Sequence, residues 1–169
     1  MATAALIAEK RHPFAPDVYE RILAFGAAIL LAAMVTAILK GRADWGQIIW
    51  PVWFHLATMT VALVLTPVML LRSRGDRLHR QLGWVWSTAM LLTAVDSLLI
   101  RQVNAGGFSF IHILSVWVVI QVPVIILSAR AHNLKRHRRA VRGMVTGALL
   151  IAGFFTFPFD RLLGHWLFS

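Results

Sequence analysis

The residues from Phe108 to Arg142 read FSFIHILSVWVVIQVPVIILSARAHNLKRHRRAVR and contain both an apolar run and a basic cluster. The apolar run, up to about Ala129, is long enough to cross a bilayer, because ~20 residues rising ~1.5 Å each cover a hydrocarbon layer ~30 Å thick. The basic cluster that follows is too polar to enter lipid. We therefore expect a membrane-spanning helix that ends at a water-facing, positively charged loop.

The composition of the whole chain agrees with a membrane protein. Of 169 residues, 59% are hydrophobic and only 14% are charged, whereas soluble domains are nearer 45–50% apolar and about 25% charged. The net charge of +10 comes from basic residues in short loops between apolar runs, so we expect a lipid bilayer as the partner and no nucleic acid. The absence of cysteine excludes disulfides, thiolate metal sites and iron–sulfur clusters.

Five apolar runs predict an all-α, polytopic transmembrane bundle in a single domain, residues 19–169. The expected spans are 22–39, 48–71, 82–100, 108–129 and 141–159, with a cytoplasmic tail at 1–18 and a short interfacial segment at 162–169. Of the 17 Lys and Arg residues, 13 fall on the side of the N-terminus and 4 on the other side. By the positive-inside rule, we predict a cytoplasmic N-terminus and an outside C-terminus.

The ionisable residues in and beside these spans fall into two layers. The outer layer holds His55, Asp96 and His112, and the inner, cytoplasmic layer holds His79, His132 and His137. A charged aspartate in lipid costs ~2.5–3.5 kcal/mol on insertion scales. Asp96 should therefore face protein, water or a partner such as Arg101 or a histidine.

A redox protein is the first function that fits these layers. Imidazoles on facing helices can hold a b-type haem as axial ligands. His55 and His112 would hold one haem, and His79 with His132 or His137 would hold a second, which would make a transmembrane electron carrier. Two features count against two haems: the rise from His112 to His132 is ~30 Å, and the second and fourth spans lack glycines that admit a flat macrocycle.

Other chemistries remain open for the same residues. His55, Asp96 and His112 could bind a divalent metal, since two imidazoles and a carboxylate suit non-haem iron, zinc or manganese. Asp96 could instead serve a proton-coupled carrier. The outer histidines could also make ordinary interior hydrogen bonds, and the inner ones could contact only water or lipid phosphate.

A role without catalysis is a further alternative. Gly143 and Gly147 form a small-xxx-small pair that suits close helix packing, inside the chain, in a homo-oligomer or against a larger membrane complex. An accessory or assembly subunit would have such a face. The sequence shows no phosphate-binding glycine loop, no GxSxG and no HExxH, so it indicates no particular enzyme class.

Several pieces of the chain resemble a bacterial membrane family, domain of unknown function 2306. LHRQLG at 78–83 is similar to its HR-x-x-G signature, which opens a helix. The other similar pieces are FSFIH at 108–112, HRRAVRG at 137–143, AGFFTF at 152–157, and Arg161. Two departures are Val141, where methionine is usual, and PFDR at 158–161, which replaces a shorter turn.

The resemblance covers about residues 50–168 and implies a multi-span inner-membrane protein without an established activity. By matching motif positions it singles out a set of residues for testing: His55, His79, Arg80, His112, His137 and Arg161. His132 gains nothing from it.

Overall fold

The computed structural model describes residues 15–99, 110–158 and 161–169, and within these residues all regular structure is helical. The long helices are α1 (Val18–Lys40), α2 (Trp50–Leu71), α3 (Arg77–Leu99) and α4 (Phe110–Arg130). A 3₁₀-helix, η1 (Gly41–Gln47), joins α1 to α2. The remaining helices are α5 (Leu134–Met144), the π-helical η3 (Val145–Ile151), α6 (Ala152–Phe154) and α7 (Leu162–Phe168).

The all-helical class and the membrane character are confirmed. Four helical stretches of the described chain are long and apolar enough to cross a membrane: Val18–Gln47, Trp50–Leu71, Arg77–Leu99 and His112–Arg130. They coincide with the first four expected spans to within a few residues, apart from η1 at the end of the first. The fifth span and the orientation of the termini stay predictions.

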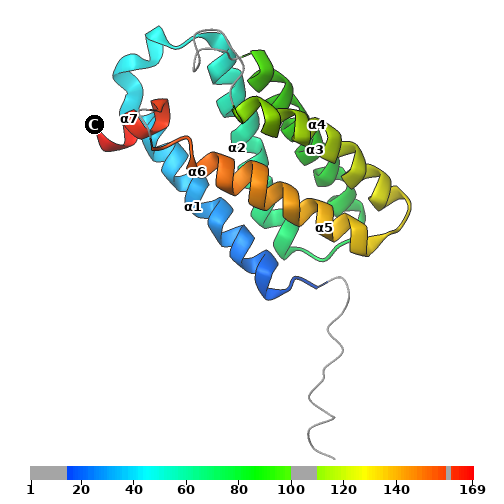
Figure 1. The fold of residues 1–169 in the computed structure, drawn as a ribbon. Coiled ribbons are helices and arrows are strands. Elements are labelled where there is room, and N and C mark those ends of the chain that lie inside the picture. Colours follow the sequence, from blue (N-terminus) through cyan, green and yellow to red (C-terminus); the bar gives the residue numbers. More distant parts are fainter. Residues whose placement is uncertain (1–14, 100–109, 159–160) are drawn as a thin grey trace, which may run out of the picture.

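The expected fifth span lies in a helical rod that begins earlier than the sequence suggests. α5, η3 and α6 follow one another without a break and form one oblique rod (Figure 1). The rod starts at Leu134, because the Asn133 side chain accepts a hydrogen bond from the backbone N–H of Arg136, at 3.0 Å. Its first half is therefore the basic cluster itself, and hydropathy alone does not mark such a segment as a span.

α1 also begins before its expected start at residue 22. Asp17 caps the helix by accepting a hydrogen bond from the N–H of Glu20, and Glu20 accepts one from the N–H of Asp17, at 3.0 and 3.1 Å. This capping box satisfies two backbone donors at the helix end. As a result, Glu20 belongs to α1, although it lies outside the expected span 22–39.

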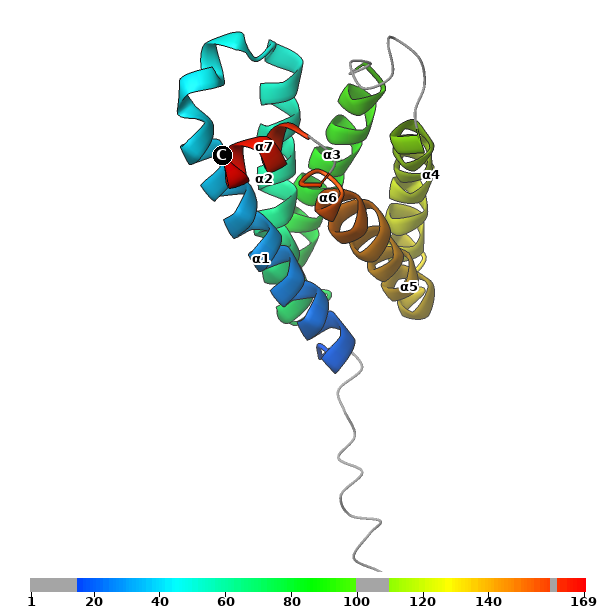
Figure 2. The same ribbon diagram turned by 60° about the vertical axis from the view of Figure 1, so that its left-hand side comes forward.

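The helices pack mainly against their neighbours in sequence, α1 on α2, α2 on α3, α3 on α4 and α4 on α5 (Figures 1 and 2). α7 turns back onto the end of α1 that is remote from Asp17. There the buried ring of Trp166 covers Gly41 so closely that no side chain fits at that position. The indole N–H of Trp166 also donates to Asp44, at 3.0 Å. The C-terminal segment therefore packs on the bundle.

The Gly143/Gly147 pair is only partly internal. A side chain at Gly147 would touch the ring of Trp117 on α4, at 3.5 Å, whereas a side chain at Gly143 would meet open space. Gly147 thus faces α4, where a Cβ would make an ordinary van der Waals contact. A homo-oligomer or partner complex using this face stays a prediction.

Candidate functional site

The outer-layer residues His55 and Asp96 lie against each other across the α2–α3 interface. His55 Nδ1 is 3.6 Å from Asp96 Oδ2, and the side chains are 26% and 4% exposed. Asp96 therefore faces protein and a histidine, as the cost of a carboxylate in lipid requires. Arg101, the other expected partner, lies outside the described residues. We call His55 and Asp96 the outer pair.

The outer pair has incomplete hydrogen bonding. His55 Nδ1 and Asp96 Oδ2 are buried, and neither atom has a hydrogen-bond partner within the described part of the chain. Their separation exceeds the usual N–H···O range of 2.7–3.2 Å. Buried polar atoms are nearly always satisfied, and exceptions often mark chemically active groups or a bound water or ion. An imidazole and a carboxylate so placed are able to accept and release protons.

Further polar side chains continue along the same interface. The hydroxyls of Thr58 on α2 and Thr93 on α3 hydrogen-bond at 2.7 Å. The indole N–H of Trp86 donates to the Thr66 hydroxyl at 2.9 Å. Together with the outer pair, these contacts form a polar seam between α2 and α3. The threonine and tryptophan contacts are satisfied hydrogen bonds, so the outer pair is the unsatisfied end of the seam.

In the inner layer, His79 on α3 and His137 on α5 lie near enough for their charges to act on each other. His137 Nδ1 is 3.1 Å from the backbone carbonyl oxygen of Ile125. His132, the other expected partner of His79, is exposed in the turn between α4 and α5, where its φ is 53°. Of the two expected partners of His79, His137 is therefore the half-buried one and His132 is the exposed one.

The remaining predicted residues have less distinctive surroundings. His112 is buried on α4. Arg80 is exposed and donates to the carbonyl oxygen of Gly75 at 3.3 Å. Arg161 is the residue directly before α7 and makes no side-chain capping bond there. These positions gain no specific role from the structure.

The three-ligand metal site has no support from side-chain geometry. Among the described residues, no three His, Asp or Glu side chains are grouped closely enough to hold a metal ion. The site of His55, Asp96 and His112 stays a prediction, as does the outer haem held by His55 and His112.

An ion cluster that the sequence analysis missed joins the start of α1 to α5. Glu20 is 1% exposed and contacts three arginines: Arg74 from the α2–α3 loop, and Arg138 and Arg142 from α5. Arg138 and Arg142 lie 3.0 and 3.1 Å from the Glu20 carboxylate oxygens. Asp17 binds the same two α5 arginines. We call these five residues the inner ion cluster.

The inner ion cluster lowers the pKa of Asp17. Burial alone would raise the pKa of this carboxyl. The backbone N–H of Glu20 and the charges of Arg142 and Arg138 outweigh that effect, so the pKa of Asp17 lies below its ordinary value of 3.8. Two sequence signals point to this region: the Asp-x-x-Glu capping box at 17–20, and the spacing of Arg138 and Arg142 by one helical turn.

Comparison with known proteins adds no further constraint. No protein-family model, curated protein or solved structure matches the chain. The resemblance to domain of unknown function 2306 stays a prediction.

Proposed function

We propose that this chain is a multi-pass bacterial inner-membrane protein, with its N-terminus in the cytoplasm, in which the outer pair takes up and releases a proton during coupled transport. The observation that carries the proposal is the buried contact of 3.6 Å between His55 Nδ1 and Asp96 Oδ2. Ionisable residues inside membrane spans are costly and usually serve proton or ion pathways.

The surroundings of the two groups favour exchange over a fixed ion pair. His55 is 26% exposed and Asp96 is 4% exposed, so we infer that a proton reaches Asp96 by way of the imidazole ring. Imidazole is the side chain whose charge changes most readily near neutral pH. Asp96 is not enclosed by arginines in the described structure, unlike Glu20. Among the described residues, no guanidinium group is in contact with the outer pair, so none competes there with a bound proton.

Proton-binding titration of the full chain in nanodiscs tests this function. Wild-type protein should bind a proton that is absent from Asp96→Asn and that binds at a shifted pH in His55→Gln, because strongly interacting groups titrate as a pair. Asp44→Asn is a matched control, since Asp44 is a carboxylate that accepts a hydrogen bond from Trp166. Wild-type and Asp96→Asn proteins with the same titration would contradict the proposal. Compounds that shift this titration would then be candidate transport substrates.

A second candidate function is electron transfer through a haem held by His79 and His137. Because a carbonyl oxygen only accepts, the contact with Ile125 places the ring proton of His137 on Nδ1 and leaves Nε2 to bind a metal. Ligating histidines are commonly oriented by such a backbone contact. The two imidazoles come from separate helices, as axial ligation of a haem between facing helices requires. When bound, the haem would supply one-electron chemistry.

A visible spectrum and metal analysis of protein from its native host test this candidate. Wild type should show a Soret band that is lost in His79→Ala and in His137→Ala. His132→Ala should keep the band, because His132 is exposed in a turn. Folded wild-type protein that is colourless and free of metal would rule this function out.

A further inference from the structure

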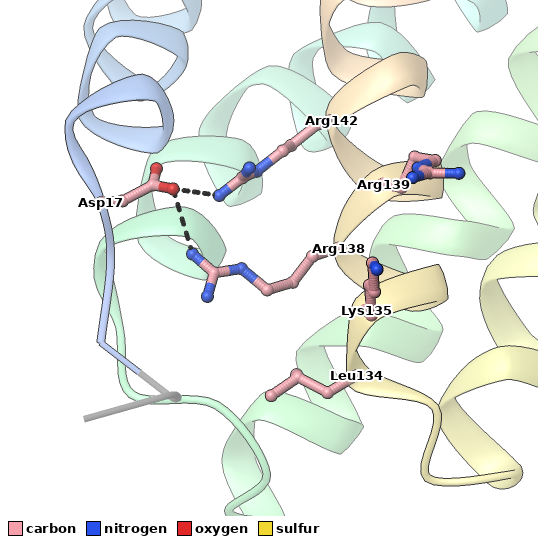
Figure 3. Close-up of a pocket in the computed structure, with 6 residues that line it drawn as sticks. All are labelled: Asp17, Leu134, Lys135, Arg138, Arg139 and Arg142. Atoms are coloured by element: carbon pink, nitrogen blue, oxygen red, sulfur yellow. Dashed lines mark hydrogen bonds and ion pairs between the residues drawn. The ribbon is translucent and has the colours of Figure 1, made fainter. Parts of the chain in front are cut away.

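A charged cleft opens beside the inner ion cluster, between the start of α1 and α5. Its volume is about 630 Å³. It is lined by Asp17, Leu134, Lys135, Arg138, Arg139 and Arg142. Figure 3 shows Arg138 and Arg142 reaching from α5 to Asp17, while Lys135 and Arg139 project from the same helix on another side. The lining is therefore predominantly cationic.

The cations of the cleft fall into two kinds. Arg138 and Arg142 are held by Asp17 and Glu20, which fixes their guanidinium groups. Lys135 and Arg139 are exposed, one helical turn apart on α5. Four cationic side chains line the cleft, and two carboxylates are in contact with them. A net positive charge remains to attract an anion.

The position of the cleft connects this charge with the membrane surface. Asp17 directly precedes the apolar stretch Val18–Gln47, which is long enough to span a membrane. On α1, Val18 and Ile22 are exposed apolar side chains close in sequence to Asp17. The cleft therefore lies at the end of a candidate span, at the level where the anionic headgroups of a bilayer are found.

We propose that this cleft binds the phosphate headgroup of an anionic phospholipid in the cytoplasmic leaflet. Lys135 and Arg139 contact the phosphate, and the acyl chains lie in the surrounding bilayer. Basic side chains next to membrane spans attract anionic lipids in this way. The binding is independent of proton exchange at the outer pair, which lies in the opposite layer of the bundle.

Lipid retention by the full chain, measured by native mass spectrometry from nanodiscs, tests the proposal. The discs contain equal amounts of phosphatidylglycerol and phosphatidylcholine. Wild type should retain phosphatidylglycerol, and Lys135→Gln/Arg139→Gln should bind it about tenfold more weakly. The control Arg77→Gln/Arg136→Gln removes two exposed positive charges that do not line the cleft. It should retain the lipid as wild type does.

Three outcomes would overturn the proposal. Equal weakening in both double variants would show attraction to surface charge without a site. Unchanged retention in Lys135→Gln/Arg139→Gln would show that these residues do not bind the headgroup. Inorganic phosphate that displaces phosphatidylglycerol at equimolar concentration would assign the cleft to a soluble anion. Thermal unfolding of the variants, unchanged from wild type, ensures that loss of binding is not loss of fold.

Discussion

The inner ion cluster and the outer pair each contain a carboxylate that is almost fully buried, yet their surroundings are opposite. Glu20 is 1% exposed and contacts three arginines. Asp96 is 4% exposed, and the ionisable partner that the structure shows for it is a histidine at 3.6 Å, beyond hydrogen-bonding distance. Burial alone therefore does not distinguish a structural carboxylate from a functional one. The difference lies in how completely the charge is compensated.

The two environments have different energetic consequences. A buried carboxylate with several hydrogen-bonded cations ties together the helices that supply them, and loss of one member leaves the others uncompensated. A buried carboxylate with poor partners costs stability, and such groups in membrane spans usually persist for function. We therefore assign Glu20 to stability and Asp96 to proton exchange, and the predictions below test this contrast.

The largest effect is expected from Glu20→Gln. The substitution leaves Arg74, Arg138 and Arg142 around a neutral amide, and breaking a buried ion pair in this way costs about 3–5 kcal/mol. Unfolding of the detergent-solubilised protein by heat or denaturant measures the loss. The matched control is Asp76→Asn, which weakens an exposed contact with Arg72 and should change stability far less. Equal losses of stability in the two variants would show that burial and charge compensation do not make Glu20 more important for stability than Asp76.

A moderate loss of stability is expected from Trp86→Phe, in the hydrogen-bonded part of the polar seam. Trp86→Phe removes the buried indole donor of the 2.9 Å hydrogen bond to Thr66, which should cost about 1 kcal/mol. Trp50→Phe is the control, because the Trp50 ring is exposed. The same unfolding assay applies. A loss in Trp50→Phe as large as in Trp86→Phe would mean that the seam does not contribute to helix association.

A smaller loss of stability is expected when Asp17 is protonated at low pH. The pKa of Asp17 is lowered in the folded protein, so its contribution to stability is present above its ordinary pKa of 3.8 and is lost as the pH falls through the lowered value. Unfolding temperatures should therefore drop more steeply below that pH for wild type than for Asp17→Asn. Parallel curves for the two proteins would show that Asp17 carries no pH-dependent stability. Because Asp17 is partly exposed, solvent screening keeps the effect modest.

The smallest effect on stability is expected from Asp96→Asn. Removing a buried carboxylate that has an unsatisfied oxygen relieves a desolvation cost. The variant should be as stable as wild type or slightly more stable, in contrast to Glu20→Gln. A destabilisation comparable to that of Glu20→Gln would place Asp96 among the structural charges and contradict the assignment.

Much of the fold follows from hydropathy, because four apolar runs are long enough to define their own helices. The pairing of Asp96 with a histidine was among the expected alternatives, since few polar partners lie at its depth.

The inner ion cluster was not predicted, because Glu20 and Arg138 are 118 residues apart and single-sequence periodicity carries no information on such pairing. The extent of α5 was missed because basic residues were interpreted as loop, although Lys and Arg favour helices. The π-helix at Val145–Ile151 has no sequence signal that we recognise.

Infrared pH titration of the full chain in lipid tests the central claim most directly. Carboxylic acids and carboxylates absorb at different frequencies, so the spectrum reports which carboxyl groups gain a proton. The account predicts a protonated-carboxyl band that changes with pH in wild type, vanishes in Asp96→Asn and shifts in His55→Gln, while Glu20→Gln leaves it in place. A titrating band that survives in Asp96→Asn and disappears in Glu20→Gln would contradict the account, because the inner cluster would then hold the exchanging proton.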